Sequence, residues 1–379
     1  MSDPTDSLPL TLPAEGWGTD AVLVQLSRAI RQRSSELGAE WAFAHMDPPT
    51  DRIAAELVAQ NAQVNQNLLH AELSPFASEI EALLMDWLAP AYGMSIGHMC
   101  AGSTLANLEA LWCAREHGAA NVVASLDAHI SIAKAANILG MPLTAVPIDE
   151  QGRLREEALP DLQTSVLVST AGTTGRGVID PLRRSGARWW HVDAAWAGPL
   201  MFSSCSERLA GIDAADSVAI SAHKLFFQPK DSALILYRDS KASDAVSMGG
   251  SYLATANVGI QGSRGANAIP LFGTLLAWGR QGLASRLDAC MAIADKLAER
   301  LGAAPGIELK QWPETGVINW RPSNGSVDSA LGRLSGVSSR TEIGGEPWLR
   351  QVAANPHANV AEIWARLERA FVSDTARDT

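Results

Sequence analysis

The chain has 379 residues, of which 47% are apolar, and a formal net charge of −11 at pH 7. This length and composition allow a large buried core, and the acidic balance argues against a nucleic-acid partner, whose phosphates require a basic face. The four cysteines are widely scattered, so we expect free thiols and no metal site. No secretory signal pattern is visible, and no apolar run approaches the roughly 20 residues of a membrane span. We therefore expect a cytoplasmic protein with small-molecule ligands and no membrane partner.

The beginning of the chain favours helices. Helical stretches are predicted over residues 20–37 and 78–88, with a Pro-rich loop at 45–50 between them. Residues 1–90 are therefore expected to form an N-terminal arm or helical segment.

The central part of the chain alternates short apolar or β-branched runs with helical stretches. This pattern is typical of an α/β fold with a mostly parallel central sheet flanked by helices. The expected strands are residues 121–125, 143–148, 165–169, 189–192, 217–220 and 233–237. We expect residues 91–275 to form the large domain.

Helical patterns dominate the last part of the chain. A long helix-rich region covers residues 269–301, and a final helix is expected over residues 360–371. We therefore expect residues 276–379 to form a linking helix and a small C-terminal α+β domain.

A lysine and an aspartate follow two of the expected strands. Ser221-Ala222-His223-Lys224 closes the strand 217–220, and Asp193 follows the strand 189–192. Ligands of such sheets bind beyond the carboxyl ends of the strands, so the two side chains are expected at one edge. An amine that condenses with an aldehyde and a carboxylate that keeps a pyridine nitrogen protonated are what pyridoxal 5'-phosphate (PLP) requires. The pair predicts PLP bound as a Schiff base on Lys224.

Three further motifs allow two interpretations each. Gly102, Ser103 and Thr104 open a helix, so they can form an anion site or an ordinary N-cap. His129 follows the strand 121–125; it can stack on a cofactor ring and help to protonate an intermediate, or it can be a hydrogen-bonded structural residue. Thr170 enters a turn rich in glycine and threonine, where it can reach a cofactor oxygen or serve the turn alone.

Short motifs in a fixed order carry a stronger signal than any single one. They are Cys100-Ala101-Gly102-Ser103, Asp127-Ala128-His129, Ser169-Thr170-Ala171-Gly172-Thr173-Thr174, His191-Val192-Asp193-Ala194-Ala195-Trp196-Ala197-Gly198 and Ser221-Ala222-His223-Lys224. The series resembles the PLP-dependent group II amino-acid decarboxylases, which include aromatic-L-amino-acid, glutamate, tyrosine and diaminobutyrate decarboxylases. Residues 67–88 and 348–357 resemble further segments of that family.

The resemblance implies a fold-type-I PLP enzyme that converts an L-amino acid to the corresponding amine and carbon dioxide. It also implies a homodimer with active sites at the subunit interface. The resemblance implies that Lys224 is the Schiff-base lysine, that Asp193 is the pyridinium partner and that His129 stacks on the ring. It assigns phosphate binding to Gly102, Ser103 and Ser221, and it places Thr170 and Ala195 at the two sides of the ring. It also places His223 beside the cofactor and gives capture of the substrate carboxylate to Arg264.

One departure from the family pattern leaves the reaction open. The segment between Lys224 and Arg264 is shorter than in the aromatic decarboxylases, whose loop carries a tyrosine that protonates the α-carbon, and Tyr252 matches that tyrosine poorly. Loss of the donor would favour another PLP reaction, namely retro-aldol cleavage, transamination or decarboxylative oxidation. A non-catalytic PLP-binding protein is the remaining alternative.

The substrate is also left open. Trp189, Trp190 and Trp196 permit an aromatic pocket, but tryptophan is commonly a core residue, and acidic and diamino substrates fit equally. Arg264 could instead form a surface or interdomain salt bridge, in which case Arg350 is the next candidate for the substrate carboxylate.

Overall fold

The computed structural model describes residues 8–251 and 253–375. The chain forms two compact units, one up to Leu37 and one from Gly38 onward. The first contains helix α1 (Thr19–Arg33), which is shorter than the predicted stretch and buries none of its side chains. No helix in the described ranges is long and apolar enough to span a membrane.

A seven-stranded sheet forms the centre of the second unit. Its order is β1-β7-β6-β5-β4-β2-β3, and only β7 runs antiparallel to its neighbours among the described strands. The strands are β1 (Ile96–Cys100), β2 (Asn121–Ser125), β3 (Leu143–Val146), β4 (Ser165–Thr170), β5 (Trp189–Asp193), β6 (Ser217–Ser221) and β7 (Ala233–Tyr237). The predicted mostly parallel sheet is confirmed.

The sequence patterns missed one strand and one helix. Strand β1 escaped because Gly97 and His98 interrupt its short apolar run. Helix α2 (Arg52–Val64) also escaped, although Asp51 caps it by accepting the backbone N–H of Ile53 at 3.0 Å, a signal that the sequence alone carries.

Alternate side chains of the sheet enter two separate hydrophobic cores. Val192, Ile220 and Leu234 belong to one core, which α3 (Pro75–Leu88) and α6 (Ala268–Ala303) also enter. Ala219 and Ile235 belong to the other, which α4 (Ser103–Glu116) and α5 (Ile130–Leu139) cover. This burial on both faces explains why the strands read as continuous apolar runs.

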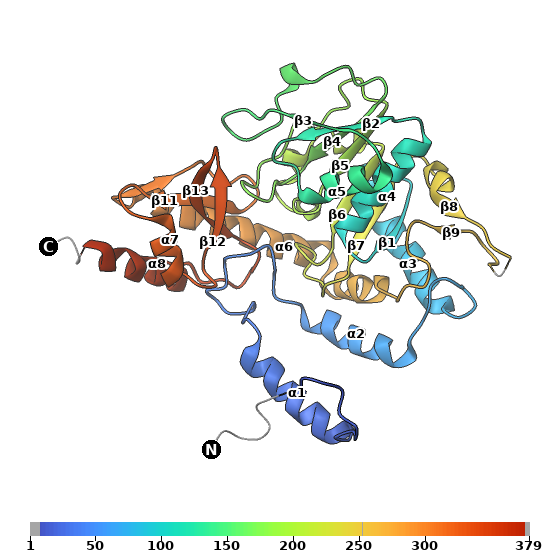
Figure 1. The fold of residues 1–379 in the computed structure, drawn as a ribbon, viewed down its shortest axis with the longest axis horizontal. Helices are drawn as coiled ribbons and strands as arrows, with labels where there is room; N and C mark the ends of the chain where they lie inside the picture. Colours follow the sequence, from blue (N-terminus) through green and yellow to red (C-terminus); the bar gives the residue numbers. More distant parts are fainter. Residues whose placement is uncertain (1–7, 252, 376–379) are drawn as a thin grey trace. The chain divides into compact units, whose positions relative to one another are not determined.

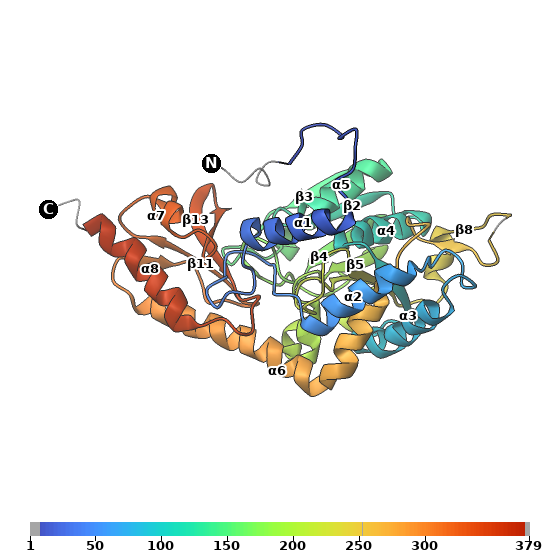
Figure 2. The same ribbon diagram turned by 90° about the horizontal axis from the view of Figure 1, so that it is seen from below.

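Helix α6 connects the large sheet to a small antiparallel one (Figure 1). The sequence predicted a single helix here, but Gly279 adopts a φ of 63° inside α6, and Figure 2 shows the two segments at an angle. The small sheet has the order β10-β11-β13-β12. Its elements and the nearby helices are β10 (Ile307–Leu309), β11 (Val317–Pro322), α7 (Val327–Arg333), β12 (Ser339–Ile343), β13 (Glu346–Val352) and α8 (Val360–Thr375).

A short hairpin of β8 (Ser247–Met248) and β9 (Asn257–Val258) lies between the large sheet and α6 in the sequence. Tyr252, which the sequence offered as a weak candidate proton donor, lies outside the described residues.

The central core predicts a clear stability contrast. Leu234→Ala removes a fully buried side chain from β7 and should lower the free energy of unfolding by about 2 to 5 kcal/mol. Leu143→Ala, on the edge strand β3, removes a side chain that is 41% exposed and should lower the free energy of unfolding far less. Denaturant unfolding of both variants measures the difference, and equal losses would contradict the packing described here.

Candidate active site

The carboxyl ends of β2, β4, β5 and β6 meet at one edge of the sheet because these strands are parallel. Thr170, Asp193 and Ser221 end three of these strands, and Lys224 follows the last. The N-terminus of α4 lies at the same edge, since the Ser221 hydroxyl donates to Ser103 Oγ at 2.8 Å. The predicted grouping of these residues is therefore present in the fold.

Lys224 is partly buried in the turn after β6. Burial lowers the pKa of its ammonium group, while the negative charge of Asp193 opposes that shift. A lowered pKa increases the fraction of neutral amine, which is the nucleophilic form. Lys224 thus has the chemistry needed to attack an aldehyde.

Two histidines flank the lysine, and burial lowers the pKa of both rings. The backbone N–H of Ser131 donates to His129 Nδ1 at 3.2 Å, so the proton of the neutral ring lies on Nε2. His223 donates from Nδ1 to the carbonyl of Ser232 at 3.0 Å, and burial with the nearby lysine charges lowers its pKa to about 4. Both rings are therefore neutral at pH 7.

Asp193 is only 3% exposed and is held by N–H donors. The Ala195 backbone N–H donates to Oδ1 at 3.1 Å, and the Asn107 amide donates to Oδ2 at 3.0 Å. The residues at this edge whose charges act on Lys224 are Asp193, Asp47, Lys230 and Arg350. Asp193 is thus a buried acceptor poised for a further donor.

Two features of the edge fit PLP. The buried hydroxyl of Thr170 has no hydrogen-bond partner in the part of the chain that the structure describes, so it is available to a ligand oxygen. Helix α4 starts after Gly102 without a side-chain cap, and a side chain at Gly102 would meet open space, which suits a phosphate at the helix N-terminus. Together with Lys224 and Asp193, these groups match the aldehyde, the pyridine nitrogen and the phosphate of the cofactor.

Arg264 already has a partner in the structure. Its Nη1 and Nη2 donate to the two carboxylate oxygens of Glu81 at 2.5 and 2.6 Å. Glu81 is a buried residue of α3, and a buried carboxylate needs such a partner. Arg264 is therefore in an ion pair with Glu81, as the alternative salt-bridge interpretation expected, and its role toward a substrate carboxylate stays a prediction.

The charge of Arg350, which lies on β13, contributes to the lowered pKa of Lys224. Arg350 donates from Nη1 to the Thr174 carbonyl at 2.8 Å and from Nε to Ser339 Oγ at 3.1 Å. Its Nη2 has no partner among the described residues. Burial lowers the pKa of Arg350, and the charge of Asp47 opposes this. Arg350 therefore offers a partly buried cation with a free donor.

The sequence patterns predicted no metal site. In the described structure, ligand atoms of His98, Cys100 and Glu109 all lie within 4.8 Å of one another. His98 Nε2 is already 2.7 Å from Glu109 Oε1, which is the contact of a buried pair. This cluster lies on β1 and α4 and shares no residue with the Lys224 site.

Sequence reasoning missed Asn107 and Asp180. Asn107 follows Ser103 by one helical turn, so the two share a face of α4, but nothing in the sequence identifies Asp193 as its partner. Asp180 accepts the Thr170 backbone N–H at 2.8 Å and fixes the end of β4. Burial raises its pKa to about 6.

Comparisons with known proteins identify the family of the chain. The model of the pyridoxal-dependent decarboxylase conserved domain matches residues 5–321. The chain is 31% identical to the L-2,4-diaminobutyrate decarboxylase of Rhizobium meliloti over 82% of this chain and 70% of that protein. It is 30% identical to the cysteine sulfinic acid decarboxylase of Mus musculus over 72% of this chain and 64% of that protein.

A solved structure supports the fold. The glutamate decarboxylase domain of the diaminobutyrate-pyruvate transaminase and L-2,4-diaminobutyrate decarboxylase of Vibrio parahaemolyticus superposes with a TM-score of 0.85 at 21% identity, over 96% of this chain and 88% of that one. With the family model matched over most of its length, the chain belongs to the pyridoxal-dependent decarboxylases of group II, which use PLP to decarboxylate amino acids.

Proposed function

We propose that Lys224 and Asp193 are the central residues of a PLP-dependent amino-acid α-decarboxylase. The observation that carries this proposal is their position on neighbouring strand ends, where the charge of Asp193 acts on the buried lysine. Lys224 Nζ would hold the aldehyde carbon of PLP, and Asp193 would accept the pyridine N–H. When bound, PLP supplies a ring that accepts the electron pair released as the Cα–carboxylate bond breaks.

The other residues of the edge position the cofactor and the substrate. Ser221 and the start of α4 at Gly102, Ser103 and Thr104 would hold the phosphate through hydroxyls and backbone N–H groups. His129 would lie against the ring as a neutral imidazole, because its burial disfavours the cation.

Four more residues complete the proposed site. Thr170 and Ala195 would flank the ring, and the unpaired Thr170 hydroxyl supports this. His223 would lie beside the cofactor with Nε2 as its free acceptor, since Nδ1 donates to Ser232. Arg350 would orient the substrate carboxylate so that the bond to be broken is held in a reactive geometry.

We propose a small L-amino acid with a charged side chain as the substrate. Trp189, Trp190 and Trp196 are buried, and each indole N–H is already bonded, to Ser217 Oγ, Ser169 Oγ and the Thr315 carbonyl. They are therefore core residues. Asp47, Lys230 and Arg350 supply charges near Lys224, and the relatives named above act on diaminobutyrate and on cysteine sulfinate.

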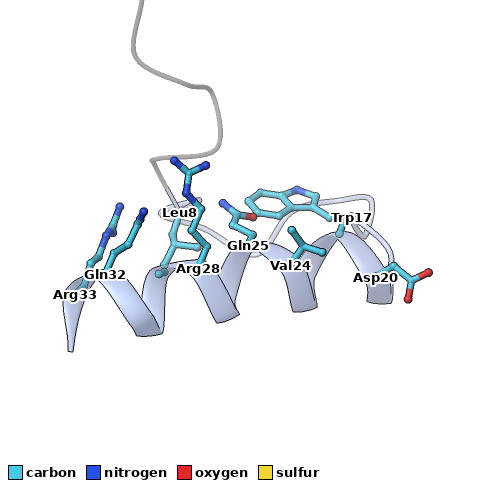
Figure 3. Close-up of a pocket in the computed structure, with 10 residues that line it drawn as sticks. Leu8, Trp17, Asp20, Val24, Gln25, Arg28, Gln32 and Arg33 are labelled. Atoms are coloured by element: carbon cyan, nitrogen blue, oxygen red, sulfur yellow. The ribbon is translucent and has the colours of Figure 1, made fainter. Parts of the chain in front are cut away.

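We further propose a cytoplasmic homodimer with active sites at the subunit interface. All four cysteines are buried and free, which suits a reducing compartment. Helix α1 exposes the apolar side chains of Leu23, Leu26 and Ile30. A pocket of the same unit is lined in part by Leu8, Trp17 and Val24 (Figure 3). Apolar surface of this kind is typical of an interface. The domain boundaries 1–90, 91–275 and 276–379 remain part of this proposal.

The reaction can be tested with the purified chain loaded with PLP. We expect carbon dioxide and the matching amine from at least one of 2,4-diaminobutyrate, aspartate and cysteine sulfinate, and little from tryptophan or tyrosine, as measured by mass spectrometry. Lys224→Ala should abolish turnover because it removes the amine that is proposed to hold the aldehyde. Turnover of aromatic substrates alone would contradict the proposed substrate class, and release of an aldehyde or keto acid would contradict the reaction.

The two arginines provide a matched pair of variants. Arg350→Lys keeps the charge but loses the planar guanidinium, so kcat/KM should fall at least about tenfold. Arg264→Lys should mainly lower the free energy of unfolding, because it weakens the bidentate pair with Glu81. Steady-state kinetics and denaturant unfolding measure both effects. The opposite pattern would return the substrate role to Arg264.

The oligomeric state can be tested by light scattering. We expect a species of twice the 40.2 kDa chain mass. Replacing Leu23 and Ile30, which are 59% and 64% exposed, by serine should shift the population toward the monomer, because it removes apolar surface from α1. Arg31→Ser, a polar change on the same helix, is the control. A monomeric native chain would refute the homodimer.

A further inference from the structure

We infer that Asn107 is the positioning residue of this active site, and that its amide fixes both the Asp193 carboxylate and the tautomer of His129 through a buried hydrogen-bond chain that begins at Trp189. The inference deepens the proposed function, because it rests on the roles given there to Asp193 and His129. This hydrogen-bond chain links side chains of β5, β6 and α4 and then reaches the start of α5.

The direction of the chain follows from its Asp193 end. A carboxylate only accepts hydrogen bonds, so the group that faces Asp193 Oδ2 at 3.0 Å must be the amide nitrogen of Asn107. The amide oxygen then faces His191 Nε2 at 3.0 Å. Because that oxygen can only accept, His191 carries its proton on Nε2.

The other end is compatible with the direction that the Asp193 end fixes. His191 is fully buried, and burial lowers its pKa to about 4, so the ring is neutral and its Nδ1 accepts the Ser217 hydroxyl at 2.9 Å. The Ser217 oxygen in turn accepts the indole N–H of Trp189 at 2.9 Å. An indole N–H can only donate. Both ends thus orient every donor toward the active site.

A branch of the chain leads to His129. Asn107 Nδ2 also lies 2.9 Å from Ser131 Oγ, so its two hydrogens serve Asp193 and Ser131. With its oxygen occupied as an acceptor, Ser131 donates its hydroxyl to His129 Nδ1 at 2.8 Å, and its backbone N–H donates to the same atom at 3.2 Å. His129 is therefore held with its proton on Nε2.

Burial makes the orientation strict. Asn107 and Ser131 are each 1% exposed and His191 and Ser217 are fully buried, so water cannot replace a lost partner. Asn107 lies one turn after Ser103 on α4, so the same helix would present N–H groups to the phosphate and an amide to the carboxylate that holds the ring nitrogen. Asn107 thereby couples the two ends of the cofactor site.

The hydrogen positions can be measured without the cofactor. In PLP-free protein with ¹⁵N-labelled histidine, NMR of the ring nitrogens should show His191 and His129 as Nε2–H tautomers. Asn107→Leu, which removes the amide at similar volume, should change the tautomer populations of both rings. Ser131→Ala removes the hydroxyl donor but keeps the backbone donor, so it should shift the Nδ1 signal of His129 without changing its tautomer and leave His191 as it is.

The effect on the cofactor has a spectroscopic test. In the PLP-loaded protein, Asn107→Leu should shift the pH midpoint of the visible absorption band by about one unit or more and lower kcat over tenfold with little change in KM, because Asp193 loses a donor. Asn107→Asp should shift the pH midpoint further, since two carboxylates in contact would share a proton. The control is Asn355→Leu, which replaces an equally buried asparagine that bonds the Ala39 carbonyl and should affect stability alone.

Two results would overturn the inference. One is an Asn107→Leu protein with wild-type tautomers and a wild-type absorption titration, which would reduce Asn107 to a core residue. The other is an unchanged Nδ1 signal of His129 in Ser131→Ala, which decides the question if the Asn107→Leu protein does not fold. Failure of the proposed function would differ, because wild-type protein would then release no carbon dioxide from any amino acid while the tautomers could still be read.

Discussion

The burial of the Asp193 carboxylate is the constraint on which the rest of the site depends. A carboxylate that is 3% exposed must be compensated by donors, and here they are the Ala195 backbone N–H and the Asn107 amide. No Arg or Lys bonds it among the described residues, so its charge stays available to a cationic ligand ring. His191 and Asp193 thus place polar side chains of β5 in the buried centre of the sheet.

Helix α4 turns that constraint into a geometry. It packs on β5, β6 and β7, so it cannot move without disturbing the sheet core. Its uncapped N-terminus faces the ligand edge at Ser103, and Asn107 reaches Asp193 one turn later. The distance between the proposed phosphate site and the proposed ring-nitrogen site is therefore set by a rigid element. A cofactor that binds both is held at the two points that fix its orientation.

Much of the proposed site could be predicted because each residue lies at or just after the end of a strand that the sequence predicts. Lys224, Asp193, His129 and Ser221 each follow or end a strand, and parallel strands bring their carboxyl ends together without any knowledge of side-chain contacts. The strands themselves were readable as apolar runs, whereas β1 and α2 were not predicted. The domain limits, the roles of the individual residues and the dimer still await the experiments that would decide them.

The parts that could not be predicted depend on partners far away in the sequence. Arg264 lies in a family-like motif, but in the fold it pairs with Glu81, which is 183 residues away and accepts hydrogen bonds from both of its terminal nitrogens. Arg350 comes from the small sheet and reaches the site only because that sheet lies against the turn that contains Thr174. A motif identifies a guanidinium, but only the fold shows which donors are already used. The proposed role of Arg350 toward the substrate carboxylate rests on this difference between the two arginines.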